Sequence, residues 1–302
     1  FSTYAGNPYF ISLEDLIEQG LLTEKECDKV DFGSKTDKVD YEKLYNGRFE
    51  LLKTAYEKSD ISEREEFKRF KAENAYWLKD YAMFMAIKER FNGQSFDHWA
   101  EDIKLRWEYS MEYYESELAD EITFYEFIQY EFYRQWYKLK KYANDNGIKI
   151  IGDIPIYVAY DSADVWAHPE LFQIDDERNP IAVAGCPPDG FSATGQLWGN
   201  PLYKWDYHKY TNYDWWIKRI ERSVKLYDVV RIDHFRGFDE YYSIPAKDKD
   251  ATGGHWEKGP GIDLFNGIKY CLGDINIIAE DLGYITDTVR QLVKDSGFPN
   301  MK

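Results

Sequence analysis

The chain is poor in the residue types that build disulfide frameworks and metal centres. It has 302 residues but only three cysteines and five histidines. The cysteines, Cys27, Cys186 and Cys271, lie far apart and form no CxxC pair, which favours free thiols in a reducing, cytoplasmic compartment. The histidines are scattered without metal-ligand spacing. No run of about 18 apolar residues is present to span a membrane, and no signal-peptide pattern follows Phe1.

Positive charge is also scarce, since 55 acidic residues stand against 38 basic ones and the formal net charge is −17. Nucleic-acid binders neutralise phosphates with Lys and Arg, so this balance argues against a nucleic-acid partner. Aromatic residues, in contrast, reach 18%. Most of them are expected in the core, but rings with a polar tip also form the surfaces on which sugar rings stack. The composition therefore favours a neutral ligand.

Hydrophobic patterning divides the chain into three parts. Residues 1–40 form a mixed entry segment and loop, in which Ser12 is a predicted N-cap with Asp15 three positions later. Residues 41–146 carry apolar side chains at three- and four-residue steps, which predicts a helical region that ends before Gly147 in a left-handed cap. Packing is the expected role of this region, because it contains no recognisable chemistry.

From residue 147 to 302 the pattern alternates between strands and helices. Strand-like segments occur in "IKIIGDIPIYV", "LYDVVRIDHF" and "DINIIAEDLG", and helical patterns occupy 213–226, 265–274 and 286–298. This alternation predicts an α/β fold with parallel strands and right-handed crossovers. The three strands end near Asp153, Asp233 and Glu280, at the sheet edge where barrel active sites lie. A Gly- and Pro-rich stretch, 183–206, is interpreted as a long aromatic loop over that edge.

Two of these carboxylates fit glycoside chemistry, which uses one ionised and one protonated carboxyl group. Arg231 precedes Asp233 by two residues, so both side chains lie on one strand face. The guanidinium would favour the ionised form, which makes Asp233 the expected nucleophile. Glu280 follows an apolar run that would favour its protonated form, as an acid and later a base requires. Residue spacing alone also allows a plain ion pair and a helix cap.

Four longer motifs add a resemblance to this interpretation. The segments "GDIPIYVAYDSADVWAHPELF", "VAGCPPDGFSATGQLWGNPLY", "VVRIDHFRGF" and "IIAEDLG" occur in this order. Together with "STYAGNPYFISLEDLIEQGLL" and "YWLKDYAMFMAIKERF", they resemble the amylomaltases, 4-alpha-glucanotransferases of glycoside hydrolase family 77. The resemblance implies a partial (β/α)8 TIM-type barrel with a large all-helical insertion at 41–146, and 147–302 as central strands and helices of the barrel.

The resemblance also implies roles for individual residues. Asp233 matches the family nucleophile and Glu280 the acid/base. Substrate-binding positions are implied for the following residues: Arg231, His234, Asp153, Asp189, Phe191 and Trp198. The family uses no metal or organic cofactor, and its substrates are alpha-1,4-glucans and maltooligosaccharides, with glucose as an acceptor.

Two departures from the family pattern leave alternatives open. Gly190 stands in the loop "PPDGFS", where relatives often carry a bulky residue. A further catalytic aspartate of the family, in a later His-Asp motif, has no match in these 302 residues, so a central fragment is expected. The chain is therefore interpreted as part of a glucanotransferase. An alpha-glucan hydrolase and a catalytically inert, glucan-binding fragment are the alternatives.

Overall fold

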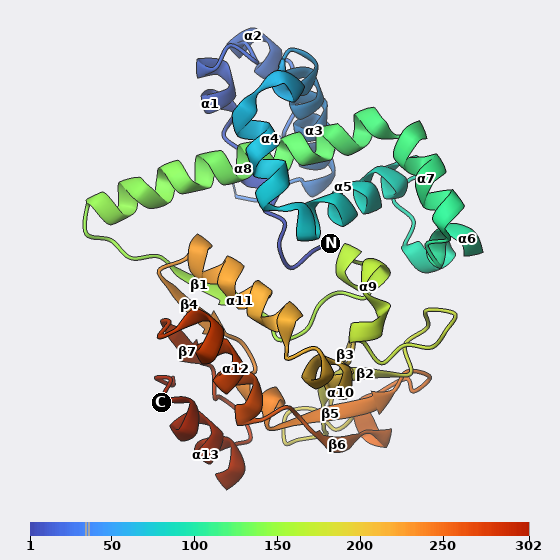
Figure 1. Cartoon of the computed structure of the whole chain (residues 1–302), viewed down its shortest axis with the longest axis vertical. Helices are drawn as coiled ribbons and strands as arrows, with labels where there is room; N and C mark the ends of the chain where they lie inside the picture. Colours follow the sequence, from blue (N-terminus) through green and yellow to red (C-terminus); the bar gives the residue numbers. More distant parts are fainter. Residues whose placement is uncertain (34, 36, 302) are drawn as a thin grey trace. The chain divides into compact units, whose positions relative to one another are not determined.

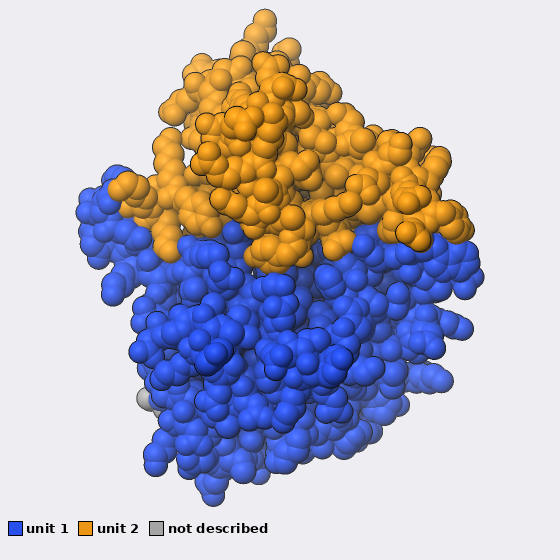
Figure 2. Space-filling view, in the orientation of Figure 1, with its two compact units in different colours: residues 1–4, 94–107, 142–302 blue, residues 5–93, 108–141 orange. Residues whose placement is uncertain are grey.

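The computed structural model describes residues 1–33, 35 and 37–301, and the chain forms two compact units (Figures 1 and 2). The helical unit comprises residues 5–93 and 108–141, and the sheet unit comprises residues 1–4, 94–107 and 142–302. The division differs from the one expected from the sequence. Residues 5–40 cluster with the helices, and residues 94–107 cluster with the sheets.

The helical unit is built from short and long helices. These are α1 (Leu13–Glu18), α2 (Glu24–Cys27), α3 (Tyr41–Glu57), α4 (Glu65–Glu73), α5 (Ala75–Arg90), α7 (Glu108–Glu117) and α8 (Ala119–Asp145), with 3-10 turns at Pro8–Phe10 and Ile61–Glu63. The unit boundary falls within α8, after Lys141. Ser12 caps α1 as predicted, because its hydroxyl accepts the Asp15 N–H at 3.1 Å. Gly147 adopts the predicted left-handed conformation, with φ +76°.

Helix α3 shows how apolar spacing forms the core of this unit. Gly47, Leu51 and Ala55 follow one another at four-residue steps and are buried, as is Leu52. A Cβ atom on Gly47 would lie 2.3 Å from Cγ1 of Val30. Glycine weakens a helix interior, so its presence here is explained by the close approach of the segment around residue 30.

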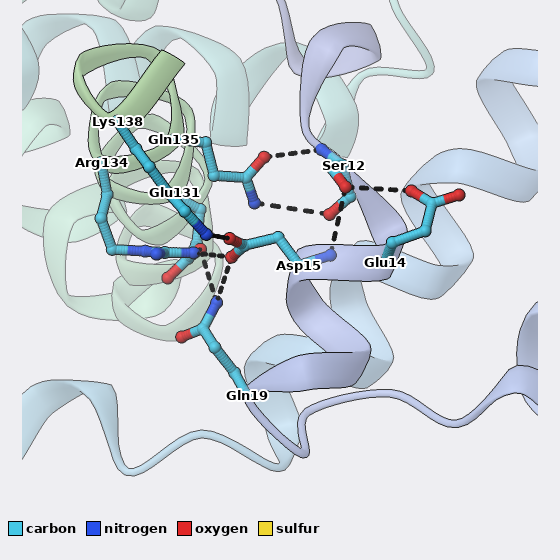
Figure 3. Close-up of polar contacts among 8 residues, drawn as sticks. All are labelled: Ser12, Glu14, Asp15, Gln19, Glu131, Arg134, Gln135 and Lys138. Carbon is cyan, nitrogen blue, oxygen red and sulfur yellow. Dashed lines mark hydrogen bonds and ion pairs between the residues drawn. The ribbon is translucent and has the colours of Figure 1, made fainter. Parts of the chain in front are cut away.

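A polar network joins α1 to α8 within the helical unit (Figure 3). The Asp15 carboxylate pairs with Arg134 and, at 3.0 Å, with Lys138. Arg134 also pairs with Glu131 at 2.8 Å, and Gln19 donates to the same Glu131 oxygen at 3.1 Å. Glu131 is completely buried, with 0% of its surface exposed. The positive charge of Arg134 therefore balances the negative charges of two carboxylates, one of which is inaccessible to solvent.

The sheet unit contains a three-stranded parallel sheet. Its strands β1 (Ile151–Ile154), β4 (Val229–Ile232) and β7 (Ile277–Ala279) pair in the order β1-β4-β7. Helices α11 (Asp214–Leu226), α12 (Ile262–Leu272) and α13 (Asp287–Ser296) follow the strands in turn, and α11 packs against β1 and β4 (Figure 1). The predicted strand–helix alternation is confirmed, and the structure is a mixed α/β fold. The described sheet has only these three parallel strands.

A second, antiparallel sheet corrects the interpretation of 183–206 as one long loop. Strands β2 (Ala182–Cys186), β3 (Gln196–Pro201), β5 (Glu240–Pro245) and β6 (His255–Lys258) pair in the order β3-β2-β5-β6. Within that stretch, loop 187–195 connects β2 to β3, and a short segment, 202–204, connects β3 to the following helix. Gly185, one of the glycines that indicated a loop, serves close packing instead, since a Cβ on it would lie 2.1 Å from the Gln196 carbonyl oxygen.

Short helical segments complete the sheet unit. They are α6 (Glu101–Lys104), α9 (Ala163–Ala167), α10 (Trp205–Tyr210) and 3-10 turns at Phe96–His98, Pro169–Leu171, Phe235–Phe238 and Ala251–Gly253. The segment after β1 is held by buried polar groups. The Ile156 carbonyl accepts the Tyr203 hydroxyl at 2.7 Å and Arg219 Nη1 at 3.0 Å. The Arg219 guanidinium also lies 4.7 Å from the Trp216 ring centre.

Replacing Arg134 by Met should destabilise the contact between α1 and α8 by about 3 kcal/mol, because a buried Glu131 would lose its cation. Lys138→Met is the matched control; its side chain is 67% exposed, and an exposed pair contributes about 0–1 kcal/mol. Amide hydrogen exchange in α1 and α8 measures both effects. Equal losses of exchange protection in the two variants would contradict the role of Arg134 as the shared partner of Asp15 and Glu131.

The same contact should weaken in acid. Burial opposes ionisation of Asp15, but hydrogen bonds from Arg134 and Lys138 outweigh it and lower the pKa of Asp15 below its ordinary value. The stabilisation is therefore fully present above the ordinary aspartate pKa and is lost as the pH falls through the lower folded value. Exchange protection in α1 that stays constant down to strongly acidic pH would argue against this linkage.

Candidate active site

The parallel sheet brings charged side chains together at the carboxyl ends of its strands. Asp153 of β1 is paired in register with Arg231 of β4, and Asp233 follows β4 directly. Glu280 follows β7, the strand on the other side of β4. The alternation of side chains along β4 places Ile232 in the core, completely buried, and leaves Arg231 on the other face. The expected meeting of the three strand ends is therefore present.

Arg231 lies between two carboxylates. Its Nη1 is 2.6 Å from Oδ1 of Asp153, and its Nη2 is 3.0 Å from Oδ1 of Asp233. The hydrogen bond that Arg231 donates to Asp153, together with the charges of both carboxylates, raises the pKa of Arg231 against the opposing effect of burial. The Asp233 side chain remains 48% exposed and therefore accessible to a ligand. One fixed cation thus orients two carboxylates that would otherwise repel each other.

Glu280 is held by main-chain donors rather than by a cation. Its Oε2 accepts the His234 N–H at 2.8 Å, and its Oε1 accepts the Leu282 N–H at 2.7 Å. The residue is only 8% exposed. The apolar run before Glu280 correctly predicted its burial, but the two amide donors could not be read from the sequence. The direction of the first donor depends on the backbone of His234, whose φ of +54° is left-handed and unusual for a residue with a side chain.

His234 and Trp198 meet edge to face at this end of the sheet. Their ring centres are 4.9 Å apart with planes at 86°. Burial, together with the charge of Arg236, lowers the pKa of His234 to about 4, so its imidazole is neutral near pH 7. Trp198 is 37% exposed, and its indole N–H donates to Gln196 at 2.9 Å. Both Trp198 and His234 therefore offer rings at fixed positions beside Glu280.

Sequence reasoning missed the neighbours that hold Trp198. Gln196 lies two positions before Trp198 on β3, and residues two apart on a strand share a face. Tyr157 packs against Trp198 with ring centres 6.2 Å apart. The first contact could have been found if 196–201 had been recognised as a strand, whereas the second joins distant parts of the sequence.

The loop 187–195 contains Asp189 and Phe191. Oδ1 of Asp189 accepts the N–H groups of Phe191 and Ser192, both at 2.8 Å. This is a turn-stabilising arrangement for an aspartate. It leaves Phe191 fully exposed, and a Cβ on Gly190 would meet no atom within 4 Å. The structure thus shows Asp189 shaping the turn and Phe191 presented at its tip.

The described part of the chain lacks two further kinds of feature. Within residues 1–33, 35 and 37–301, no three His, Cys, Asp or Glu side chains gather as a bound metal ion would require. No helix among these residues combines the length and apolar character needed to cross a bilayer.

Carboxylates and an arginine thus stand at the carboxyl ends of adjoining parallel strands of an α/β protein, the edge at which proteins of this class place their active sites. Comparison with known proteins gives the family. Residues 1–302 match the family model of glycoside hydrolase family 77, described as 4-alpha-glucanotransferase, and the chain belongs to this family.

Individual relatives agree with this membership. The chain is 48% identical to a 4-alpha-glucanotransferase of Clostridium butyricum over 303 residues, which cover all of this chain and 62% of that protein. Relatives with the same description come from Streptococcus pneumoniae, at 49% identity and 60% of that protein, and from Thermus thermophilus, at 46% identity and 60% of that protein. The chain therefore spans about three-fifths of the length of these relatives.

Solved structures show the same likeness. The amylomaltase from Streptococcus agalactiae in complex with acarbose matches all of this chain and 61% of its own, with a TM-score of 0.95 and 44% identity. The amylomaltase from Corynebacterium glutamicum is 21% identical and has a TM-score of 0.75, over 99% of this chain and 41% of its own, which shows the fold alone.

The neutral state of His234 can be measured directly. The ordinary histidine pKa is about 6.5, so the folded pKa of about 4 means that folding releases a proton from His234 at intermediate pH. The folded state should therefore lose stability as the pH falls from the ordinary value towards the folded one. Imidazole NMR shifts should show no His234 titration near neutrality, and a midpoint close to the ordinary value would contradict its burial.

Proposed function

We propose that the chain supplies the nucleophile and the acid/base of a 4-alpha-glucanotransferase. The Asp233 carboxylate attacks the anomeric carbon of an alpha-1,4-glucan while Glu280 protonates the departing 4-oxygen, which leaves a covalent glycosyl-enzyme. Glu280 then takes the proton from the 4-hydroxyl of glucose or of another glucan, and that oxygen displaces Asp233. Two displacements retain the anomeric configuration and regenerate both carboxyl groups.

The observation that carries this proposal is the position of Arg231 between Asp153 and Asp233. A guanidinium at 3.0 Å from Asp233 stabilises the charged form that a nucleophile needs. The half-exposed carboxylate remains open to a sugar on its other side. We propose that Asp153 binds the donor sugar or orients Arg231, since its own side chain is 60% exposed.

The surroundings of Glu280 are compatible with proton transfer in both directions. Each of its oxygens uses one lone pair for a main-chain N–H, so a further lone-pair position remains for the proton that it donates and later receives. The amide bonds restrict the carboxyl group to one orientation. Such preorganisation is what efficient general acid–base catalysis requires.

Aromatic side chains on the same edge supply the proposed acceptor site. Trp198 offers a partly exposed ring on which an acceptor sugar can stack, and Phe191 can cover it from the loop tip, with Asp189 fixing the turn that presents Phe191. The neutral His234 is assigned a hydrogen bond to the donor sugar. An acceptor held in this way excludes water, which favours transfer over hydrolysis.

We further propose that residues 147–302 belong to a (β/α)8 barrel and that the mainly helical region 41–146 is an insertion into that barrel. Three parallel strands in sequence order, each followed by a helix, support this fold. A parallel bridge between Ala279 and Asn300 on the outer side of β7 is consistent with the start of another strand. Three free cysteines support a cytoplasmic location.

Asp233→Asn should lower glucosyl transfer by about 10⁴-fold or more, because the neutral amide cannot form the glycosyl-enzyme. The variant is assayed in a protein that is as long as the relatives and includes these 302 residues. Asp153→Asn is the matched control and should lose far less, since it leaves Arg231 and Asp233 paired. Retained turnover in the Asp233→Asn variant would remove the assigned nucleophile.

Trp198→Ala should shift the products of maltotriose from transfer towards hydrolysis by about tenfold, because loss of one stacking face weakens sugar binding by about 1.4 kcal/mol. Trp198→Phe keeps a flat ring and should retain most of the transfer. Released glucose compared with longer oligosaccharides gives the ratio. A ratio that is the same in all three proteins would place Trp198 outside the acceptor site.

A further inference from the structure

We propose that Arg236 is a positioning residue for Glu280, because it anchors the turn 280–284 that follows this carboxyl group. This inference rests on the proposed role of Glu280 as the acid/base. It adds to the site a residue that neither contacts the sugar in the proposed reaction nor belongs to the carboxylate pair.

Arg236 joins three segments of the sheet unit. It lies in the turn Phe235–Phe238 after β4 and is only 4% exposed. Its guanidinium lies over the Trp256 ring of β6, 3.9 Å from the ring centre. Its Nη1 donates to the Tyr284 carbonyl oxygen at 2.8 Å. The antiparallel sheet therefore supports, through one planar side chain, the turn that begins at Glu280.

Beyond Asp281, whose carboxylate accepts Asn300 Nδ2 at 2.7 Å and the Met301 N–H at 3.2 Å, the turn has few other tertiary anchors among the described residues. At its start, the Glu280 carbonyl accepts the Phe235 N–H at 3.0 Å, in addition to the two amide bonds to the Glu280 carboxyl group. Further along, Leu282 is 50% exposed and Tyr284 is 74% exposed, so their side chains contribute little packing. Since the Leu282 N–H itself holds Oε1 of Glu280, displacement of the turn would move the carboxyl group.

The energetics argue that Arg236 serves more than packing. A buried guanidinium has a high desolvation cost, and apolar replacements of buried charged groups are often neutral or stabilising. Burial lowers the pKa of Arg236, and the charges of Glu240 and Asp239 only oppose this effect. The presence of an arginine at this position is explained if the several N–H donors of its guanidinium hold the turn 280–284 in place. An ammonium group or an apolar side chain could not do so.

The test compares two donor substrates. The enzyme used is a protein that is as long as the relatives and includes these 302 residues. Maltotriose requires a proton on its leaving oxygen, whereas alpha-maltosyl fluoride releases fluoride without help from an acid. If Arg236 positions the acid, Arg236→Met should lower kcat on maltotriose by about 10- to 100-fold, with little change in KM. Initial fluoride release should change by less than about threefold, because this step needs no proton donor.

Three further variants make the outcome decisive. Arg236→Lys keeps the charge but not the fork and should also be selective for maltotriose, so it carries the test if Arg236→Met does not fold. Arg290→Met removes a guanidinium that is 61% exposed on α13 and should leave both donors unaffected. Glu280→Ala should show the same selectivity as Arg236→Met, in a stronger form.

Equal losses on both donors in Arg236→Met and Arg236→Lys, or no loss in either, would overturn the positioning role. If Glu280→Ala is selective and the Arg236 variants are not, only the role of Arg236 fails. If Glu280→Ala itself affects both donors equally, the assignment of the acid/base in the proposed function fails, and the role of Arg236 fails with it.

Discussion

The candidate site depends on one guanidinium that lies between two carboxylates. Arg231 pairs with Asp153 across the β1–β4 register and with Asp233 beyond the end of its own strand. Without it, two negative charges at neighbouring strand ends would repel each other and turn towards solvent. The parallel register fixes the first pair, and the alternation of side chains along β4 fixes the second. The pairing of the strands thus also determines which charged groups meet at the site.

The two proposed catalytic carboxyl groups are held in different ways. Asp233 faces a charged side chain and remains half exposed, whereas Glu280 is buried and faces two main-chain amides. The two carboxyl groups therefore have distinct electrostatic surroundings, a guanidinium for Asp233 and main-chain dipoles for Glu280. The hydrogen bond to Glu280 also explains the unusual backbone conformation of His234. The left-handed conformation directs its N–H to Glu280 while its ring packs against Trp198.

The helical unit also contains an arginine paired with two carboxylates, and there the arrangement is structural. Arg134 pairs with Asp15 and Glu131, as Arg231 pairs with Asp153 and Asp233. The difference lies in exposure, since Glu131 is completely buried and Asp233 is not. The pair between Asp15 and Arg134 joins two helices, and the buried Glu131 fixes the guanidinium from the same helix, whereas Asp233 remains exposed. Burial, rather than the type of pair, separates the structural network from the candidate active site.

Local patterns in the sequence predicted the local structure well. The three strands that end in carboxylates, the helix at Asp214–Leu226, the Ser12 cap and the left-handed Gly147 all depend on residues within a few positions of one another. The shared face of Arg231 and Asp233 is equally local. Strand β2 of the antiparallel sheet was missed, because Gly185, which packs closely against the Gln196 carbonyl, resembled a loop residue.

The sequence by itself determined which elements form and which side chains stand at their ends. Only the tertiary structure decided that Asp153 is the partner of Arg231 and that the His234 amide holds Glu280. The physical reason is that these contacts depend on how distant strands and turns pack against one another. Residue spacing cannot encode such geometry, since the contacting atoms meet only after the core has formed.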